Sequence, residues 1–205
     1  ASVLIGQAWG ARETAMVKAI TGATLTLGAL VGLIAAVLGS LFARPALQVL
    51  GTPLDVLDEA VGYAQMMMLI MPLLLVFILY TQLLRGVSDT VSPLLALIVS
   101  TLVGLLLTPA LIRGWIGLPP MGIQSAAYAG LAGNAAAMLF LVLRLRHKQH
   151  VMAPDRELLA ALRLDRVILA KVLRIGLPTG LQMVVLSLSE LVILALVNGH
   201  GSQAT

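Results

Sequence analysis

The chain has 205 residues, of which 60% are hydrophobic and only 11% are charged, and its mean hydropathy is +1.02. Soluble domains carry roughly 25% charged residues, so this composition excludes a water-soluble globular protein. The net charge of +4 comes from basic residues that are not interleaved with aromatic residues, which argues against a nucleic acid partner, and the absence of cysteine excludes disulfides and thiolate metal sites in this chain.

The first predicted elements are a helix end and four long uncharged stretches. Residues 1–10 have the composition of the end of a membrane helix, and we expect the chain to be a fragment that begins within one. The stretches without a charged side chain cover residues 19–43, 60–84, 90–112 and 114–143. A helix that rises 1.5 Å per residue needs about 20 residues to cross the roughly 30 Å hydrocarbon core, so each stretch is long enough to span a membrane.

A fifth span is expected near the end of the chain, after a basic connection. Gly176 and Pro178 open this span, because proline fits the first turn of a helix, where its missing N–H has no partner to lose. We therefore predict an all-α fold, a polytopic membrane helix bundle. Residues 1–146 form its first unit, residues 147–173 form a linker, and residues 174–205 start a second unit.

The basic residues are distributed unequally between the two sides of the predicted bundle. If successive connections lie on opposite sides of the membrane, eleven of the thirteen basic residues share one side, and the positive-inside rule makes that side cytoplasmic. Only Arg44 and Arg113 fall on the other side. This bias predicts a cytoplasmic linker, and we expect a multi-pass protein of the plasma (inner) membrane. The eleven residues are Arg12, Lys18, Arg85, Arg144, Arg146, Lys148, Arg156, Arg163, Arg166, Lys171 and Arg174.

The linker has the pattern of a short amphipathic helix at the membrane surface. Pro154 and Asp155 precede several leucines that are interspersed with charged residues. We interpret this segment as a connection rather than a regulatory element. His147 and His150 lie in its basic run and pair with no carboxylate at metal-ligand spacing, so no metal site is predicted.

The turn after the second span combines Arg85, Gly86, Asp89 and Thr90 within six residues. Asp89 or Thr90 is expected to cap the next helix, because a side-chain oxygen at a helix N-terminus accepts a hydrogen bond from a free N–H. Arg85 is expected to hold exposed carbonyls or a lipid phosphate. We interpret this turn as a structural hinge.

A few polar or polarizable side chains inside the spans are candidates for lining a cavity. An amide has four hydrogen-bonding capacities to satisfy, so it is hard to accommodate among apolar side chains. A methionine is flexible and adapts to varied apolar ligands. The alternative for all of these residues is ordinary packing between helices. The candidates are Gln65, Met68, Gln82, Asn134 and Gln182.

Glu190 is a single carboxylate in otherwise apolar sequence, about 18 Å past Pro178 at 1.5 Å per residue. A charge at the bilayer centre costs at least about 2.5–3.5 kcal/mol, so an ionisable residue there suggests a functional site. Glu190 is therefore a candidate for coupling to a cation or proton. The alternative is a structural carboxyl group that is hydrogen-bonded to Gln182, Ser187 or Asn198.

Five short motifs stand at the ends of the predicted helices. They are Ile5-Gly6-Gln7-Ala8-Trp9-Gly10-Ala11-Arg12, Gly51-Thr52-Pro53, Arg85-Gly86-x-x-Asp89-Thr90, Pro119-x-x-Gly122 and Ile175-Gly176-Leu177-Pro178. In order and spacing they resemble the multidrug and toxic compound extrusion (MATE) family. The resemblance covers essentially the whole chain.

The resemblance implies a transporter rather than an enzyme. The family has twelve helices in two six-helix lobes and exports cationic amphipathic compounds in exchange for protons or sodium ions, without a cofactor. By this resemblance the chain holds the end of helix 2, helices 3 to 6, the interlobe linker and helix 7. The partners it implies are the lipid bilayer and an amphipathic, cationic small molecule, and the full-length protein is expected to be monomeric.

The chain departs from the family pattern at three positions. Two sites that carry oxygen-bearing side chains in some members fall on Gly104 and Gly130, which have none, so a sodium site there is expected to be depleted. A carboxylate that some members have in helix 7 falls on Leu186, and Glu190 follows one helical turn later on the same face.

Three alternatives to an exporter are open at this point. The first is a flippase for lipid-linked oligosaccharides or other lipids, which shares the broader fold but favours a basic cavity, and no Lys or Arg lies within a predicted span. The second is a membrane-embedded enzyme, for which Glu190 has no convergent catalytic companion. The third is a scaffold that transports nothing.

Overall fold

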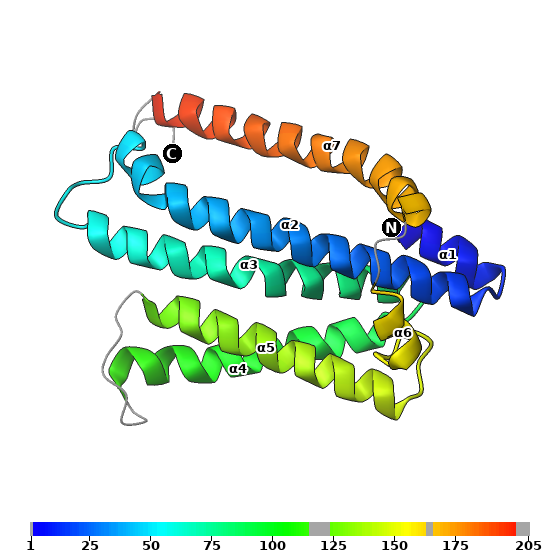
Figure 1. Cartoon of the computed structure of the whole chain (residues 1–205). Coiled ribbons are helices and arrows are strands. Elements are labelled where there is room, and N and C mark those ends of the chain that lie inside the picture. Colours follow the sequence, from blue (N-terminus) through cyan, green and yellow to red (C-terminus); the bar gives the residue numbers. More distant parts are fainter. Residues whose placement is uncertain (1, 115–123, 163–165, 200–205) are drawn as a thin grey trace.

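The computed structural model describes residues 2–114, 124–162 and 166–199, and these residues form seven helices and no strand. In chain order the helices are α1 (Ser2–Gly10), α2 (Thr14–Val49), α3 (Leu57–Gly86), α4 (Val91–Arg113), α5 (Gln124–His147), α6 (Arg156–Ala160) and α7 (Arg166–Gly199) (Figure 1). Helices α2 to α5 and residues Val167–Glu190 of α7 are long and apolar enough to cross a membrane. The prediction of an all-α polytopic membrane bundle is confirmed.

A left-handed glycine terminates α4. Gly114 has φ of 70° and is the C-cap of α4, and the described part of α5 covers Gln124–His147. Glycine suits this position because it has no Cβ to clash in the left-handed conformation, which is common just after the last residue of a helix. Residues 115–123, with the Pro119-x-x-Gly122 motif, lie outside the described residues.

The last helix also begins earlier than expected. Helix α7 starts at Arg166, so Pro178 lies in its interior and not in its first turn. Interior prolines are tolerated in membrane helices because neighbouring groups and local adjustments satisfy the freed carbonyl. The same holds for Pro72 in α3 and Pro109 in α4, which also lie inside their helices.

Close packing through small residues holds α2 against α3. A Cβ placed on Gly32 would lie 2.6 Å from Cα of Pro72, and one on Gly39 would lie 2.5 Å from the sulfur of Met68. Helices α4 and α5 form a second pair, in which a Cβ on Gly133 would lie 2.9 Å from the carbonyl oxygen of Ser100. Small residues serve this purpose in membranes because they let two backbones approach and increase van der Waals contact.

The main core lies at one end of the bundle, which we call the α6 end. This end carries α1, α6, the start of α2 and the ends of α3 and α5, whereas the turn between α2 and α3 lies at the opposite end (Figure 1). Several large side chains here are fully buried, and they come from four helices and the linker. They include Ile5, Val17, Tyr80, Leu83, Leu84, Leu141, Leu145 and Met152.

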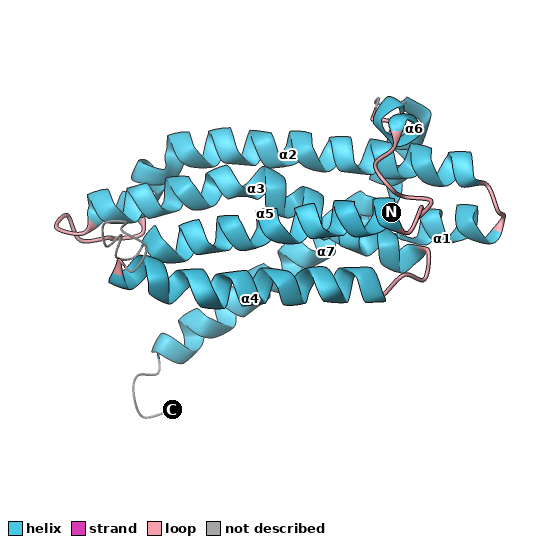
Figure 2. Cartoon of the chain, turned by 90° about the horizontal axis from the view of Figure 1, so that it is seen from below, coloured by secondary structure: helices cyan, strands magenta, loops and turns pink. Residues whose placement is uncertain are grey.

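Helix α7 packs only along one side of the other helices. It runs beside α2 in Figure 1, and Figure 2 shows its C-terminal part directed away from the rest of the bundle. Only 6% of its membrane-length window is buried. The exposed apolar side chains of α7 thus leave a surface that lipid or further protein can cover.

Candidate functional site

The turn between α3 and α4 is built around the carboxylate of Asp89. Its Oδ1 accepts a hydrogen bond from the N–H of Ser92 at 3.0 Å, and its Oδ2 accepts one from the hydroxyl of Ser92 at 2.6 Å. Nε of Arg144, from α5, donates to the same hydroxyl at 3.2 Å. Of the two residues expected to cap α4, Asp89 performs this role, whereas Thr90 makes no side-chain cap hydrogen bond.

His150 connects the linker to this turn. Its Nε2 lies 3.9 Å from Oδ2 of Asp89, and its Nδ1 accepts a hydrogen bond from the N–H of Met152 at 3.2 Å. Burial lowers the pKa of His150, and Lys148 adds to this effect, while Asp89 opposes it. Burial alone would raise the pKa of Asp89, but the two hydrogen bonds from Ser92 and the nearby His150 and Lys148 outweigh it, so the pKa of Asp89 is lowered.

The glycines of two sequence motifs meet where α1 crosses the end of α3. A Cβ on Gly86 would lie 2.7 Å from Cγ2 of Ile5 and 2.8 Å from the carbonyl oxygen of Ser2, and one on Gly6 would lie 3.4 Å from the carbonyl oxygen of Gly86. Gly86 therefore requires a residue without a side chain for this crossing, whereas a Cβ at Gly6 would make an ordinary van der Waals contact. Gly10, by contrast, ends α1 and has open space around its Cα.

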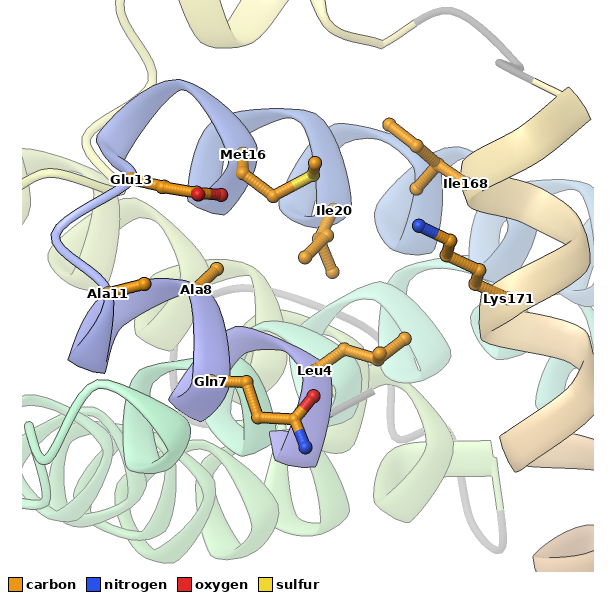
Figure 3. A pocket seen from close by; sticks show the side chains of 9 residues that line it. All are labelled: Leu4, Gln7, Ala8, Ala11, Glu13, Met16, Ile20, Ile168 and Lys171. Carbon is orange, nitrogen blue, oxygen red and sulfur yellow. The ribbon is translucent and has the colours of Figure 1, made fainter.

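A pocket of about 280 Å³ lies at the α6 end, between α1, α2 and α7. Figure 3 shows Gln7 and Leu4 on α1, with Ile168 and Lys171 extending from α7 on the other side. Glu13, from the turn between α1 and α2, also lines the pocket. The pocket therefore brings an amide, a carboxylate and an ammonium group to the boundary between α7 and the earlier helices.

A larger groove of about 680 Å³ runs between α7 and helices α1, α2 and α3. Its walls are mostly apolar, and Gly176 and Gly180 of α7 line it with open space around each. Thr24 of α2 also lines the groove, and its buried hydroxyl has no hydrogen-bond partner among the described residues. The groove therefore presents a mainly apolar surface.

The five candidate cavity residues do not come together. Nε2 of Gln65 donates to the carbonyl oxygen of Ser40 at 3.3 Å and joins α3 to α2, while Nδ2 of Asn134 donates to the carbonyl oxygen of Gly130 within α5. Gln82 and Gln182 are exposed. None of the five lines the pocket or the groove.

Glu190 lies on the exposed surface of α7. It forms no hydrogen bond or ion pair with any residue in the described part of the chain, so the proposed partners Gln182 and Ser187 do not hold it, and Asn198 has no described side chain. Gln182 comes four residues after Pro178 and therefore lies on the neighbouring turn of the same side of α7.

Sequence reasoning missed two ion pairs at the α6 end. Nζ of Lys18 forms ion pairs with Asp155 and Glu157, each at 2.6 Å. No local pattern indicates these pairs, because their members are 137 and 139 residues apart. Within residues 2–114, 124–162 and 166–199, no group of three His, Asp or Glu side chains is placed to hold a metal ion.

Comparison with known proteins gives consistent matches. The family model MatE matches residues 1–110. The chain is 39% identical over 204 residues to the probable multidrug resistance protein YoeA of Bacillus subtilis, covering 100% of this chain and 44% of that protein. It is 22% identical over 201 residues to the multidrug export protein MepA of Staphylococcus saprophyticus, covering 98% of this chain and 43% of that protein. The chain thus spans less than half the length of these relatives, and no solved structure matches it.

Proposed function

The chain belongs to the MatE family, and on this premise we propose that the full-length protein is a secondary active exporter of amphipathic organic cations. The observation that carries the proposal is the 39% identity to a probable multidrug resistance protein along the whole chain. The membrane-length helices agree with it. The full-length protein is proposed to act as a monomer in the plasma membrane and to transport its substrate without changing it chemically.

Export would be driven by a proton or sodium gradient through alternating access, in which two lobes rock against each other around a central site. In this chain, helices α1 to α5 would belong to the first lobe and α7 to the second. The pocket and the groove described above lie between these two groups of helices, where such a movement would change the spacing.

Glu190 is the residue of this chain that we propose to couple export to the gradient. It is the carboxylate within the apolar part of α7, and its side chain is exposed, so further helices of the second lobe would have access to it. A carboxyl group in that position can hold a proton or sodium ion in one arrangement of the lobes and release it in the other.

The test is export by the full-length protein from vesicles with an imposed proton or sodium gradient. We expect gradient-dependent export of a fluorescent organic cation by the natural protein. Glu190→Gln should retain binding of this dye but lose gradient-driven export and its pH dependence. Glu59→Gln, which changes an exposed carboxylate at the start of α3, is the matched control and should export normally.

Two results would count against the proposal in different ways. If Glu190→Gln exported the dye at the normal rate with unchanged pH dependence, Glu190 would not be the coupling group. If the natural protein exported no organic cation under either gradient but moved a lipid-linked oligosaccharide across the membrane, the flippase alternative would replace the exporter.

A further inference from the structure

Residues 148–162, which connect α5 to the segment before α7, are packed into the first group of helices. We call these residues the strap. Met152 is fully buried, Leu158 is 2% exposed and Ala153 is 7% exposed. Met152 and Ala153 belong to the same core cluster as Tyr80 of α3 and Leu145 of α5. A connection that swings freely between two lobes would not carry its apolar side chains in the core of one of them.

Backbone groups of the strap are held by side chains of α3 and α5. The hydroxyl of Tyr80, itself 1% exposed, donates to the carbonyl oxygen of Met152 at 2.5 Å. Two guanidinium nitrogens of Arg146 donate to the carbonyl oxygen of Pro154 at 3.2 Å and 3.0 Å. Because both acceptors are backbone atoms, the three hydrogen bonds fix the path of the chain as well as the position of side chains.

Lys18 of α2 joins the strap through two carboxylates. Its ammonium group donates to Oδ2 of Asp155 and to Oε2 of Glu157, each at 2.6 Å, and its side chain is only 16% exposed. Asp155 also caps α6, since its Oδ1 accepts from the N–H of Leu158 at 2.8 Å. The hydrogen bond from Lys18 lowers the pKa of Asp155, so this carboxylate stays charged at neutral pH. Asp155 thus both caps α6 and attaches it to α2 through its ion pair with Lys18.

The end of the strap follows the same face of α2. A Cβ on Gly22 would overlap the backbone carbonyl of Ala161, and the hydroxyl of Thr26 donates to the carbonyl oxygen of Leu162 at 3.2 Å. Lys18, Gly22 and Thr26 are spaced by four residues, so they form one stripe along α2. Along this stripe, Lys18 binds the two carboxylates, Gly22 leaves space for the backbone of Ala161, and Thr26 donates to the carbonyl oxygen of Leu162.

We propose that the strap is mechanically part of the first lobe and keeps its position on α2, α3 and α5 throughout the transport cycle. The relative movement of the lobes is therefore not taken up within residues 148–162. This inference rests on the proposed function, because it assigns a role in alternating access.

The test measures distances in the full-length protein with pairs of spin labels on introduced cysteines. These 205 residues contain no cysteine, so labels in this part of the protein attach only where they are placed. One pair joins Leu159 of the strap to Thr90 at the start of α4, and the other joins Leu159 to Arg174 of α7, all three being exposed. When the direction of the ion gradient is reversed, the Leu159–Thr90 distance should stay the same and the Leu159–Arg174 distance should change.

Two further variants test the attachment itself. Lys18→Glu should broaden the Leu159–Thr90 distance distribution, and exchanging the charges with Lys18→Glu and Glu157→Lys should narrow it again. Arg156→Glu is the matched control, because Arg156 is exposed and lies next to Glu157 without an ion pair in the described structure. This control should leave the distribution unchanged.

A shift in the Leu159–Thr90 distance during the cycle would overturn the proposal, because the strap would then move relative to the first lobe. An unshifted Leu159–Arg174 distance would also overturn it, because the movement would then lie beyond α7. Gradient-driven export by the same labelled protein is measured in parallel. If the unlabelled natural protein does not export the organic cation at all, the proposed function is wrong. The measured distances test only the position of the strap.

Discussion

At the scale of single residues, Asp89 connects three segments. Its carboxylate accepts hydrogen bonds from the N–H and the hydroxyl of Ser92, and it lies beside His150 of the strap. The hydroxyl of Ser92 also accepts a hydrogen bond from Arg144. Ser92 is fully buried, so water cannot replace Asp89 as the hydrogen-bond acceptor for its hydroxyl. The order of the turn therefore depends on this one side chain.

Replacing Asp89 with alanine should destabilise the full-length protein by about 1–2 kcal/mol, since it removes a helix cap and leaves a buried hydroxyl with one partner fewer. The measurement is thermal unfolding in detergent. Substrate affinity should stay normal, because Asp89 is placed to cap a helix. Thr90→Ala is the control and should have little effect, since the Thr90 side chain is exposed and makes no cap hydrogen bond. Normal stability of the Asp89 variant together with lost substrate affinity would contradict this assignment.

At the scale of the helices, contact between α2 and α3 depends on residues that lack side chains. Gly28, Gly32 and Gly39 of α2 face Leu79, Pro72 and Met68 of α3. At Gly39 the obstacle is a flexible methionine side chain, which can move aside. At Gly32 the obstacle is the backbone of Pro72, whose fixed ring cannot adjust, so this is the position at which added volume is least tolerated.

Gly32→Ala should therefore destabilise the bundle by about 1–3 kcal/mol, because the added methyl forces α2 away from α3. Gly104→Ala in α4 is the matched control. A Cβ at Gly104 meets no atom within 4 Å, and alanine favours the helix by up to about 1 kcal/mol over glycine. The comparison needs melting temperatures of both variants in the same detergent. Equal melting temperatures would show that the close contact at Pro72 contributes nothing to stability.

At the scale of the whole molecule, the two ends of the bundle differ in charge. Arg12, Arg85 and Lys148 lie at the α6 end, as do the other basic residues of that predicted set within the described structure. Arg44 and Arg113 lie at the opposite end, near the end of α2 and of α4 (Figure 1). The alternating direction of the helices thus agrees with the connections used to sort the charges.

This arrangement predicts the orientation of the protein in the membrane. A reporter inserted at Gln149, an exposed residue of the strap, should report the cytoplasm, and one inserted at Leu54, between α2 and α3, should report the outside. The measurement is reporter activity in cells for each fusion to the full-length protein. Reversed activities at both sites would invert the orientation, and equal activities would contradict the number of spans between the two sites.

The sequence by itself indicated the membrane-length helices, the unequal distribution of basic residues between alternate connections, and a cap on α4 by Asp89 or Thr90. These properties depend on neighbouring residues, since hydropathy averages over about 20 positions and Asp89 reaches Ser92 only three residues away. The same local signals misplaced the start of α7, because a proline at a first turn and a proline inside a membrane helix have the same sequence pattern.

Only the tertiary structure decided which polar groups are used in packing and where the linker lies. Composition marks Gln65 and Asn134 as hard to accommodate among apolar side chains, but it does not show that Gln65 bonds a neighbouring helix or that Asn134 bonds its own. Lys18 and Asp155 are 137 residues apart, and their pairing requires α2, α5 and the strap to be folded together. The contacts of Gln65 and Lys18 arise from the packing of distant segments, so no local pattern encodes them.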